Sequence, residues 1–451
     1  MKQTDNFVAL TQCLATSRWS PRWLGLSVFA LALAGIFSII IVVGRTPQLA
    51  QLQLFQDLFH VSLVVHVDLS VLVWFLAMTC FAWSWLRDAM QPTPMPYFDL
   101  ASWSCMAAGM LLMALSPLSS EWTVLMSNYI PVITNQIFFL GLALVMASVV
   151  IGIIHTVPAL PKHGSHIIAW AIYASVPITA LALAAFAASY AFLDMDLSGL
   201  DFYETIFWAG GHILQFTYVQ IMLVAWIALA LALNHRLPAR RWMLPLIWIG
   251  LAVSAISPLA YLLYPVSSQE HKNFFTLQMD IATGAAGIVL GIWLLWRILN
   301  KWKPQPESRA LHGCLKMSLL LFAAGGLFGA AINGPNVRIP AHYHGSIVAV
   351  TLALMGLAYA LLPRLGFKPV AHRRLAIWQP YIYGGGQLLH ISGLAWSGGY
   401  GVLRKTPGAL GEGMSGAKIA MGVMGAGGGL AILGGLLFVI VLTLSMRHKQ
   451  P

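Results

Sequence analysis

The chain has 451 residues, of which 59% are hydrophobic and only 9% are charged. Because a soluble globular chain carries roughly 25% charged residues, this composition excludes a soluble protein and predicts an integral membrane protein. The formal net charge of +11 does not indicate binding to nucleic acid, since the basic residues stand in short loops between apolar runs rather than in one patch.

Apolar runs of about twenty residues, each long enough to cross a bilayer as a helix, recur along the whole chain. Strand-like alternation is absent at useful lengths, which excludes a membrane β-barrel. We therefore predict an all-α polytopic membrane protein in which residues 1–451 form a single twelve-helix integral membrane domain. The predicted helices begin near Leu24, Asp57, Phe98, Ser127, Ile167, Thr205, Trp242, Phe274, Leu311, Ile339, Arg374 and Lys418.

The distribution of Arg and Lys predicts the orientation, because cytoplasmic loops carry an excess of both. With the N-terminus inside, the inner loops hold most of the cations, including the group Arg236, Arg240 and Arg241. We expect a bacterial-type inner (plasma) membrane with both termini cytoplasmic. The outer segments keep some cations as exceptions: Arg45, Lys272, Arg338, Arg404 and Lys405.

Several histidines fall at one depth of the predicted bundle. His66 lies about nine residues into the second helix and His212 about eight into the sixth, while His271 stands at the entrance to the eighth and His342 and His344 open the tenth. All four helices run from outside to inside, so at about 1.5 Å per residue these imidazoles share the outer third of the membrane. A single one could simply hydrogen-bond to a neighbouring helix, but the shared depth favours metal ligation, including axial ligation of haem iron.

The spacing of the histidines bears on which of them could hold a cofactor, and on how many cofactors they could hold. His342 and His344 are two residues apart, about 200° around a helix, so they face opposite sides and can hold different cofactors. His60 lies close to His66 in sequence and competes for the same role. We prefer His66 and keep His60 as an alternative.

Several strings resemble subunit I of the haem-copper oxidase superfamily, and the resemblance follows the helix order along the whole chain. The string AHYHGS, residues 341–346, resembles the tenth-helix segment that carries one ligand for each of two haems, and IFWAGGH, residues 206–212, is similar to the sixth-helix segment whose histidine binds copper. The further strings are HVDLSVLVWF from His66, FFTLQMD from Phe274, and GGGQLLHISGLAWSGGYGVLRK from Gly384.

The resemblance implies a set of ligands for this chain. His66 and His344 would ligate a low-spin haem, His342 a high-spin haem and His212 the neighbouring non-haem metal, with both haems expected to be of b type. Outer cations would make charge-assisted hydrogen bonds with the haem propionates. The cations assigned to this role are Arg338, Arg404 and Lys405.

The chain also departs from the oxidase pattern. Oxidases have a tyrosine four residues after the sixth-helix histidine, and here that position is Phe216. Oxidases have two adjacent histidines before the eighth helix, where this chain offers Glu270 and His271. We therefore expect His212, His271 and Glu270 to hold the non-haem metal.

These departures bear on the substrate. Two histidines with a carboxylate favour iron over copper, which remains the alternative. Nitric oxide reductases of the superfamily pair haem with non-haem iron and lack the tyrosine, so the sequence favours reduction of two NO to N2O and water. The alternative is a cytochrome c oxidase, reducing O2 to water, with an unusual active-site tyrosine.

A rival from another class is a secondary transporter, since twelve spans suit one. No half-to-half repeat is evident in the sequence, and transport does not explain the histidines. The sequence contains no C-x-x-C-H motif for covalent haem attachment. We therefore expect electrons to arrive from a second subunit that carries cytochrome c or copper.

Overall fold

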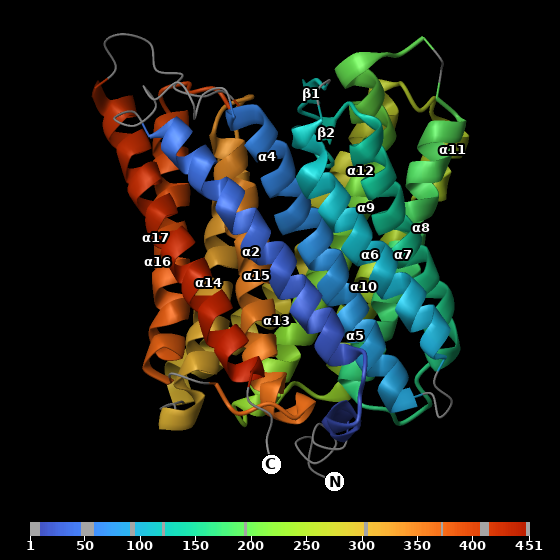
Figure 1. The fold of residues 1–451 in the computed structure, drawn as a ribbon, viewed down its shortest axis with the longest axis vertical. Coiled ribbons are helices and arrows are strands. Elements are labelled where there is room, and N and C mark those ends of the chain that lie inside the picture. Colours follow the sequence, from blue (N-terminus) through green and yellow to red (C-terminus); the bar gives the residue numbers. More distant parts are fainter. Residues whose placement is uncertain are drawn as a thin grey trace. The chain divides into compact units, whose positions relative to one another are not determined.

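The computed structural model is almost entirely helical (Figure 1), which confirms the predicted all-α fold. Internal contacts divide the chain into two compact units, and their boundaries fall inside helices. Unit 1 is Met1–Ala30 with Val67–Trp293, and unit 2 is Leu31–His66 with Leu294–Pro451. The single domain over 1–451 stays a prediction. The structure describes residues 10–46, 58–90, 95–119, 122–193, 196–301, 305–370, 373–405 and 415–447.

Unit 1 contains most of the first eight predicted spans. The first part of α2 (Ser20–Arg45) belongs to it, as does the first part of α13 (Ala285–Lys301). The whole helices of unit 1 are α5 (Trp74–Met90), α6 (Pro96–Leu115), α7 (Gln136–Thr156), α8 (Ile167–Ala191), α9 (Gly199–Ala232), α10 (Arg240–Ser254), α11 (Pro258–Leu263) and α12 (Gln269–Ala282).

Unit 2 holds the C-terminal helices together with the second part of α2 and most of α4 (Phe59–Val67). A π-helical turn over Asp68–Val73 joins α4 to α5 without a break, and such turns occur frequently at functional sites. The whole helices of unit 2 are α14 (Arg309–Ala330), α15 (Arg338–Leu361), α16 (Arg373–Gly398) and α17 (Ser415–Met446). Short 3-10 turns cover Cys13–Ala15, Ser116–Leu118, Val157–Ala159, Pro306–Ser308 and Leu362–Leu365.

Among the described residues, eleven helices are long and apolar enough to cross a membrane. The twelfth predicted span corresponds to α16, which has 26 residues but is less apolar. Gln379, Gln387 and His390 lie within α16 and lower its hydropathy.

Some predicted helix starts were wrong, either because a short pair of strands precedes the helix or because polar residues extend the helix beyond its apolar run. The span expected from Ser127 begins at Gln136, after the two-residue strands β1 (Val124–Leu125) and β2 (Val132–Ile133), and the Asn135 side chain caps it. The span expected from Thr205 begins at Gly199, and the one expected from Phe274 begins at Gln269. The predicted start at Asp57 lies outside the described residues.

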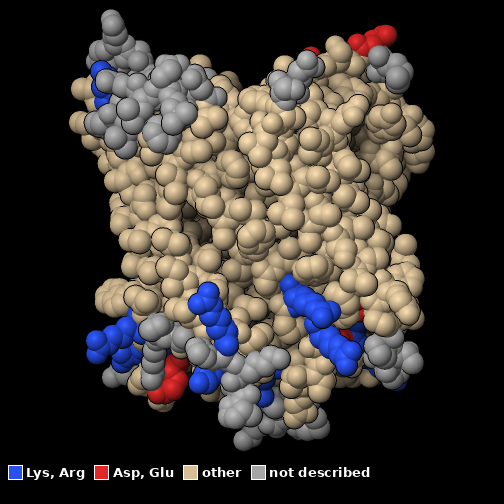
Figure 2. Space-filling model, in the orientation of Figure 1, with Lys and Arg blue, Asp and Glu red and all other residues tan. Residues whose placement is uncertain are grey.

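The most enclosed helices of the units are those that carry the predicted ligands. In unit 1, α9 is buried along nearly its whole length, and in unit 2 the same holds for α15. On the face drawn in Figure 2, Lys and Arg side chains gather mostly toward the lower end of the view, and the middle shows no charged side chain. Enclosed helices in an apolar shell provide the dry setting that buried polar ligands require.

Candidate functional site

Three predicted haem ligands of unit 2 share one hydrogen-bonding arrangement. Nδ1 of His66 lies 2.9 Å from the carbonyl oxygen of Ala34, Nδ1 of His342 lies 2.8 Å from that of Gly325, and Nδ1 of His344 lies 2.8 Å from that of Pro340. A carbonyl can only accept, so each Nδ1 donates and each neutral ring carries its lone pair on Nε2. Metal-ligating histidines typically have this second partner, which fixes the tautomer and the ring orientation.

The position of His342 depends on glycines that bring α14 and α15 together. A Cβ on Gly325 would lie 2.5 Å from the backbone nitrogen of Ser346, and one on Gly345 would lie 2.5 Å from Cα of Gly325. A Cβ on Gly329 would lie 2.5 Å from Nδ1 of His342. Small residues four apart allow this close approach of membrane helices, and here they let the imidazole reach the Gly325 carbonyl.

Unit 2 also contains a histidine that the sequence analysis did not select. The ring of His390 on α16 lies 5.2 Å from that of His344 between centroids, and its Nδ1 lies 3.0 Å from the carbonyl oxygen of Met424 on α17. His66 is close enough to interact electrostatically with both rings. The signal available in the sequence was a polar residue within a span, inside a string already linked to the family.

The predicted propionate partners occupy the end of unit 2 at which α4 and α15 begin. Arg338 donates from Nη1 to Oδ1 of Asn333 at 2.7 Å, and Arg404 is half-buried within electrostatic reach of the Tyr343 hydroxyl. The backbone of Lys405 is left-handed, with φ of 62°, and its carbonyl oxygen lies 3.3 Å from Nε2 of His60. His60 is thereby tied to the segment that follows α16, and the choice of His66 over His60 stays a prediction.

Arg45, an outer cation given no role by the sequence analysis, lies at the same end. Its Nη2 donates to the carbonyl of Leu403 at 3.2 Å, and it interacts electrostatically with His344 and His390. A cation beside two candidate haem ligands has the chemistry that a propionate would require. The sequence could not place it because the contact joins residues 45 and 403.

In unit 1, His212 has the same anchored geometry and a further polar neighbour. Its Nδ1 lies 2.7 Å from the carbonyl oxygen of Trp208, so Nε2 is the acceptor. The hydroxyl of Tyr129 lies 3.0 Å from that Nε2 and 3.9 Å from the sulfur of Met279. The hydroxyl therefore donates to the nitrogen that would face a metal.

Tyr129 is held in place from several sides. The carboxylate of Glu204 accepts from the backbone nitrogen of Asn128 at 2.8 Å and from the Asn128 side chain, which ties the loop to α9. A Cβ on Gly211 would lie 2.2 Å from Cγ of Tyr129, so the glycine before His212 makes room for the ring. Burial, followed by the charges of Glu204 and Asp280, raises the pKa of the Tyr129 phenol, which stays protonated.

The predicted non-haem ligand set is not assembled. Within the described part of the chain, no group of three or more His, Cys, Asp or Glu side chains could hold a metal ion. Glu270 and His271 are neighbours in the first turn of α12, and consecutive helical residues face directions about 100° apart. Glu270 is exposed, while His271 is buried against the rings of Tyr261 and Phe275.

Phe216 and Tyr218 on α9 are both buried. Phe216 lies near Gly250, where a Cβ would be 3.7 Å from its ring, and Tyr218 packs against Phe75 with centroids 4.8 Å apart. In the π-helical turn, Asp68 is 1% exposed, and its carboxylate oxygens have no hydrogen-bond partner among the described residues. The position four residues after His212 thus supplies no hydroxyl, and no local pattern in the sequence pointed to Tyr129.

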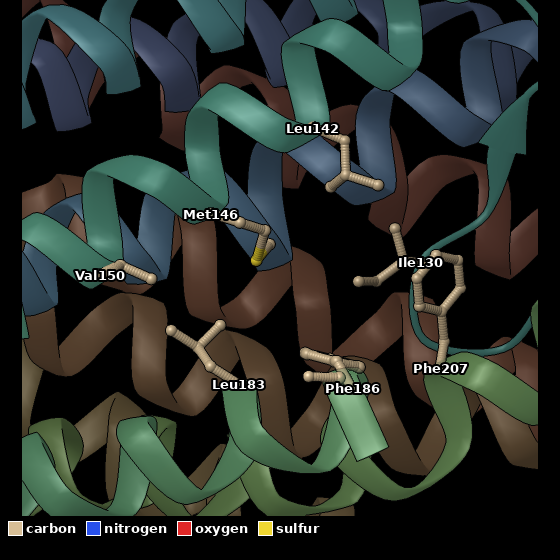
Figure 3. A pocket seen from close by; sticks show the side chains of 8 residues that line it. Ile130, Leu142, Met146, Val150, Leu183, Phe186 and Phe207 are labelled. Atoms are coloured by element: carbon tan, nitrogen blue, oxygen red, sulfur yellow. The ribbon is translucent and has the colours of Figure 1, made fainter. Parts of the chain in front are cut away.

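An apolar pocket of about 290 Å³ lies in unit 1. It is lined by eight apolar residues from α7, α8, α9 and the loop before α7. Figure 3 shows Ile130, Phe186 and Phe207 among them, and Ile130 and Phe207 are the chain neighbours of Tyr129 and Trp208. The pocket therefore adjoins the segments that carry the polar contacts of His212.

Residues 21–430 match the family described as Cytochrome C and Quinol oxidase polypeptide I. The chain belongs to this family. It is therefore a respiratory oxidoreductase of the haem-copper oxidase type, as the resemblance implied, and the family binds haems and a metal centre. The anchored imidazoles of unit 2 have the chemistry to hold haem iron, because each presents an Nε2 lone pair on a fixed ring.

Two relatives and one solved structure extend this comparison. An uncharacterized protein from Rickettsia prowazekii (strain Madrid E) is 31% identical over 93% of this chain and 94% of its own length. One from Aquifex aeolicus (strain VF5) is 26% identical over 76% of this chain and 85% of its own length. A heme-copper terminal oxidase dimer, 16% identical, matches with a TM-score of 0.79 over 97% of this chain and 85% of that chain, which shows the shared fold.

Proposed function

We propose that the chain is the catalytic subunit of a terminal complex that reduces O2 to water, with four electrons and four protons per O2. The observation that carries this proposal is the position of the Tyr129 hydroxyl, 3.0 Å from Nε2 of His212. A metal bound to that nitrogen would replace this hydrogen bond and leave the hydroxyl beside the metal. The sequence favoured NO because Phe216 removed the expected tyrosine and Glu270 supplied a carboxylate. A phenol from another segment now stands at His212, and Glu270 is exposed.

The ligand assignment follows the anchored imidazoles. His66 and His344 would hold a low-spin haem, His342 a high-spin haem and His212 the non-haem metal. When bound, these groups supply electron transfer and the binding of the gas. Because Glu270 is exposed, its carboxylate no longer favours iron over copper as the non-haem metal. We therefore propose copper, the alternative that the sequence left open.

The protein's own contribution is to place and protect a proton donor. Tyr129 keeps its proton because the phenol is buried and stands near Glu204 and Asp280. Gly211 and the Asn128–Glu204 contacts fix the ring, so the hydroxyl is oriented before the gas arrives. A preorganised donor at the reacting position costs no reorganisation during the reaction.

The apolar pocket supports an uncharged gas as the substrate. Its lining has no charged side chain, and it lies beside Ile130 and Phe207, next to the segments that carry Tyr129 and Trp208. An ion or a sugar would find no hydrogen-bond partner there. O2 and NO both satisfy this condition, so the pocket supports the substrate class and does not choose between the two gases.

Nitric oxide reduction is the second candidate, and Phe216 favours it. This buried position four residues after His212 carries no hydroxyl, as the resemblance to nitric oxide reductases implies.

Under either candidate the electron donor is a second subunit carrying cytochrome c or copper, docked on the outer side of a bacterial-type inner membrane. The termini would then be cytoplasmic, in line with the cation distribution.

The test compares O2 and NO consumption by the purified complex with an artificial electron donor. We expect faster O2 than NO consumption in the wild type and a loss of O2 uptake of about 10²-fold in Tyr129→Phe, the lower range for a positioned proton donor. Tyr190→Phe is the control, since Tyr190 is 67% exposed on α8. Faster NO consumption that Tyr129→Phe leaves unchanged would favour the second candidate.

A further inference from the structure

We propose that His390 is a reserve axial ligand of the low-spin haem, able to take the position of His344. This inference rests on the proposed assignment of His66 and His344 to that haem. All three histidines belong to unit 2. His390 is the member that the ligand assignment leaves without a function.

The ring of His390 lies beside the ring of His344. The imidazoles of His390 and His344 are 5.2 Å apart between centroids, and His66 interacts electrostatically with both. Two iron–imidazole bonds of about 2 Å each would place ring centroids roughly 6 Å apart. At 5.2 Å, the ring of His390 lies within reach of the position that His344 would occupy on the iron.

The ring of His390 is anchored to the backbone of the neighbouring helix α17. Its Nδ1 donates to the carbonyl of Met424 on α17 at 3.0 Å, so the lone pair lies on Nε2, as in the assigned ligands. Outer-shell carbonyls of this kind orient metal-ligating histidines and raise their basicity. A histidine that served only to join α16 to α17 would need just one of its two nitrogens.

The segment of α16 that carries His390 is packed closely against α17. A Cβ on Gly427 would lie 2.3 Å from the backbone nitrogen of His390, and one on Gly428 would lie 3.3 Å from its Nδ1. A Cβ on Gly386 would lie 2.5 Å from the backbone nitrogen of Ala431. Glycines thus bring α17 directly against α16 around this histidine, which fixes both its backbone and its ring.

The half-burial of the rings agrees with this role. His66, His344 and His390 are each neither fully buried nor exposed, although they lie within long helical segments. Arg45, which interacts electrostatically with His344 and His390, would supply a cation for the propionates of the same haem. His390 therefore has the tautomer, the position and the neighbours of a ligand.

The experiment measures axial ligation directly, by near-infrared magnetic circular dichroism and electron paramagnetic resonance of the purified, oxidised complex. The proteins compared are the wild type, His390→Ala, His344→Ala and the double variant. We expect His344→Ala to keep about half or more of the bis-imidazole haem, and the double variant to keep less than about a tenth. Gln387→Ala, one turn earlier on α16, is the matched control and should keep the wild-type spectrum.

Two results would overturn the proposal for His390, and a third would contradict the assignment on which it rests. If His344→Ala loses the bis-imidazole signal as completely as the double variant does, His390 is not a reserve ligand. Should His344→Ala fail to accumulate, His344→Met replaces it: a bis-imidazole spectrum supports His390, and a methionine–histidine spectrum overturns the proposal. A wild type without bis-imidazole haem would contradict the assignment of His66 and His344 in the proposed function, and this outcome is seen before the variants are measured.

Discussion

The predicted ligands on α15 and those expected at the start of α12 differ in burial and in the anchoring of their side chains. His342 and His344 lie inside a long buried helix, and both rings are anchored to carbonyls. Glu270 and His271 occupy the first turn of a helix, where one side chain is exposed and the other packs on aromatic rings. Position within a continuous helix is fixed by its periodicity, whereas a first turn depends on where the helix begins.

The largest effect in this comparison is expected from His342→Ala. Removing the proposed ligand of the high-spin haem should lower the haem content from about two per protein to about one and abolish gas reduction. Haem extraction and the CO-difference spectrum measure both. His163→Ala, at an exposed position before α8, is the control. An unchanged CO-difference spectrum in His342→Ala would remove His342 from the assignment.

The next effect should come from Gly329→Ala, which touches no cofactor itself. Its new Cβ would lie 2.5 Å from Nδ1 of His342, so the ring must shift from its carbonyl partner. We expect O2 uptake to fall about 10²-fold, the cost of misplacing a reacting group by about 1 Å. Gly326→Ala, on the same helix with nothing within 4 Å, should retain wild-type activity. Equal activities in the two variants would contradict the proposed packing.

A smaller effect is expected from Gly211→Ala. The added Cβ would lie 2.2 Å from Cγ of Tyr129 and should displace the hydroxyl from His212 while leaving haem content unchanged. We expect a loss of about tenfold in O2 uptake, less than that of a deleted proton donor. Gly250→Ala, where the nearest atom is 3.6 Å away, is the matched control. A loss of haem together with activity would mean that Gly211 acts on the fold rather than on Tyr129.

The smallest effect is expected from Glu270→Gln. Because the side chain is exposed in the first turn of α12, we expect a change in O2 uptake of less than about twofold and an unchanged metal content. Metal analysis and gas uptake measure both quantities. A large loss of non-haem metal would restore the ligand set of His212, His271 and Glu270 that the sequence predicted.

The sequence predicted the all-α membrane fold because long apolar runs leave the backbone few other ways to satisfy its hydrogen bonds. It also selected His66, His212, His342 and His344, since imidazoles within apolar spans are costly unless they have a function. Whether each of these binds metal stays a prediction. The helix starts near polar residues, as at Gly199, were the part of the fold that apolar runs could not locate.

Other parts of the site were not accessible to sequence reasoning. Tyr129 and Arg45 meet His212 and Leu403 through contacts between residues 83 and 358 positions apart. Nothing local in the chain signals such a pairing, because loops and helix ends are placed by tertiary packing. His390 was within reach, since a buried polar residue in a membrane helix is by itself a reason to look for a function.

The most direct test of the account counts electrons against gas in the purified wild-type complex. We predict that O2 is consumed with about four electrons per molecule, the stoichiometry of complete reduction to water, and that uptake is lost when Tyr129 is changed to Phe. Rapid conversion of NO to N2O, with O2 uptake much slower and independent of Tyr129, would contradict the account and make this chain a nitric oxide reductase.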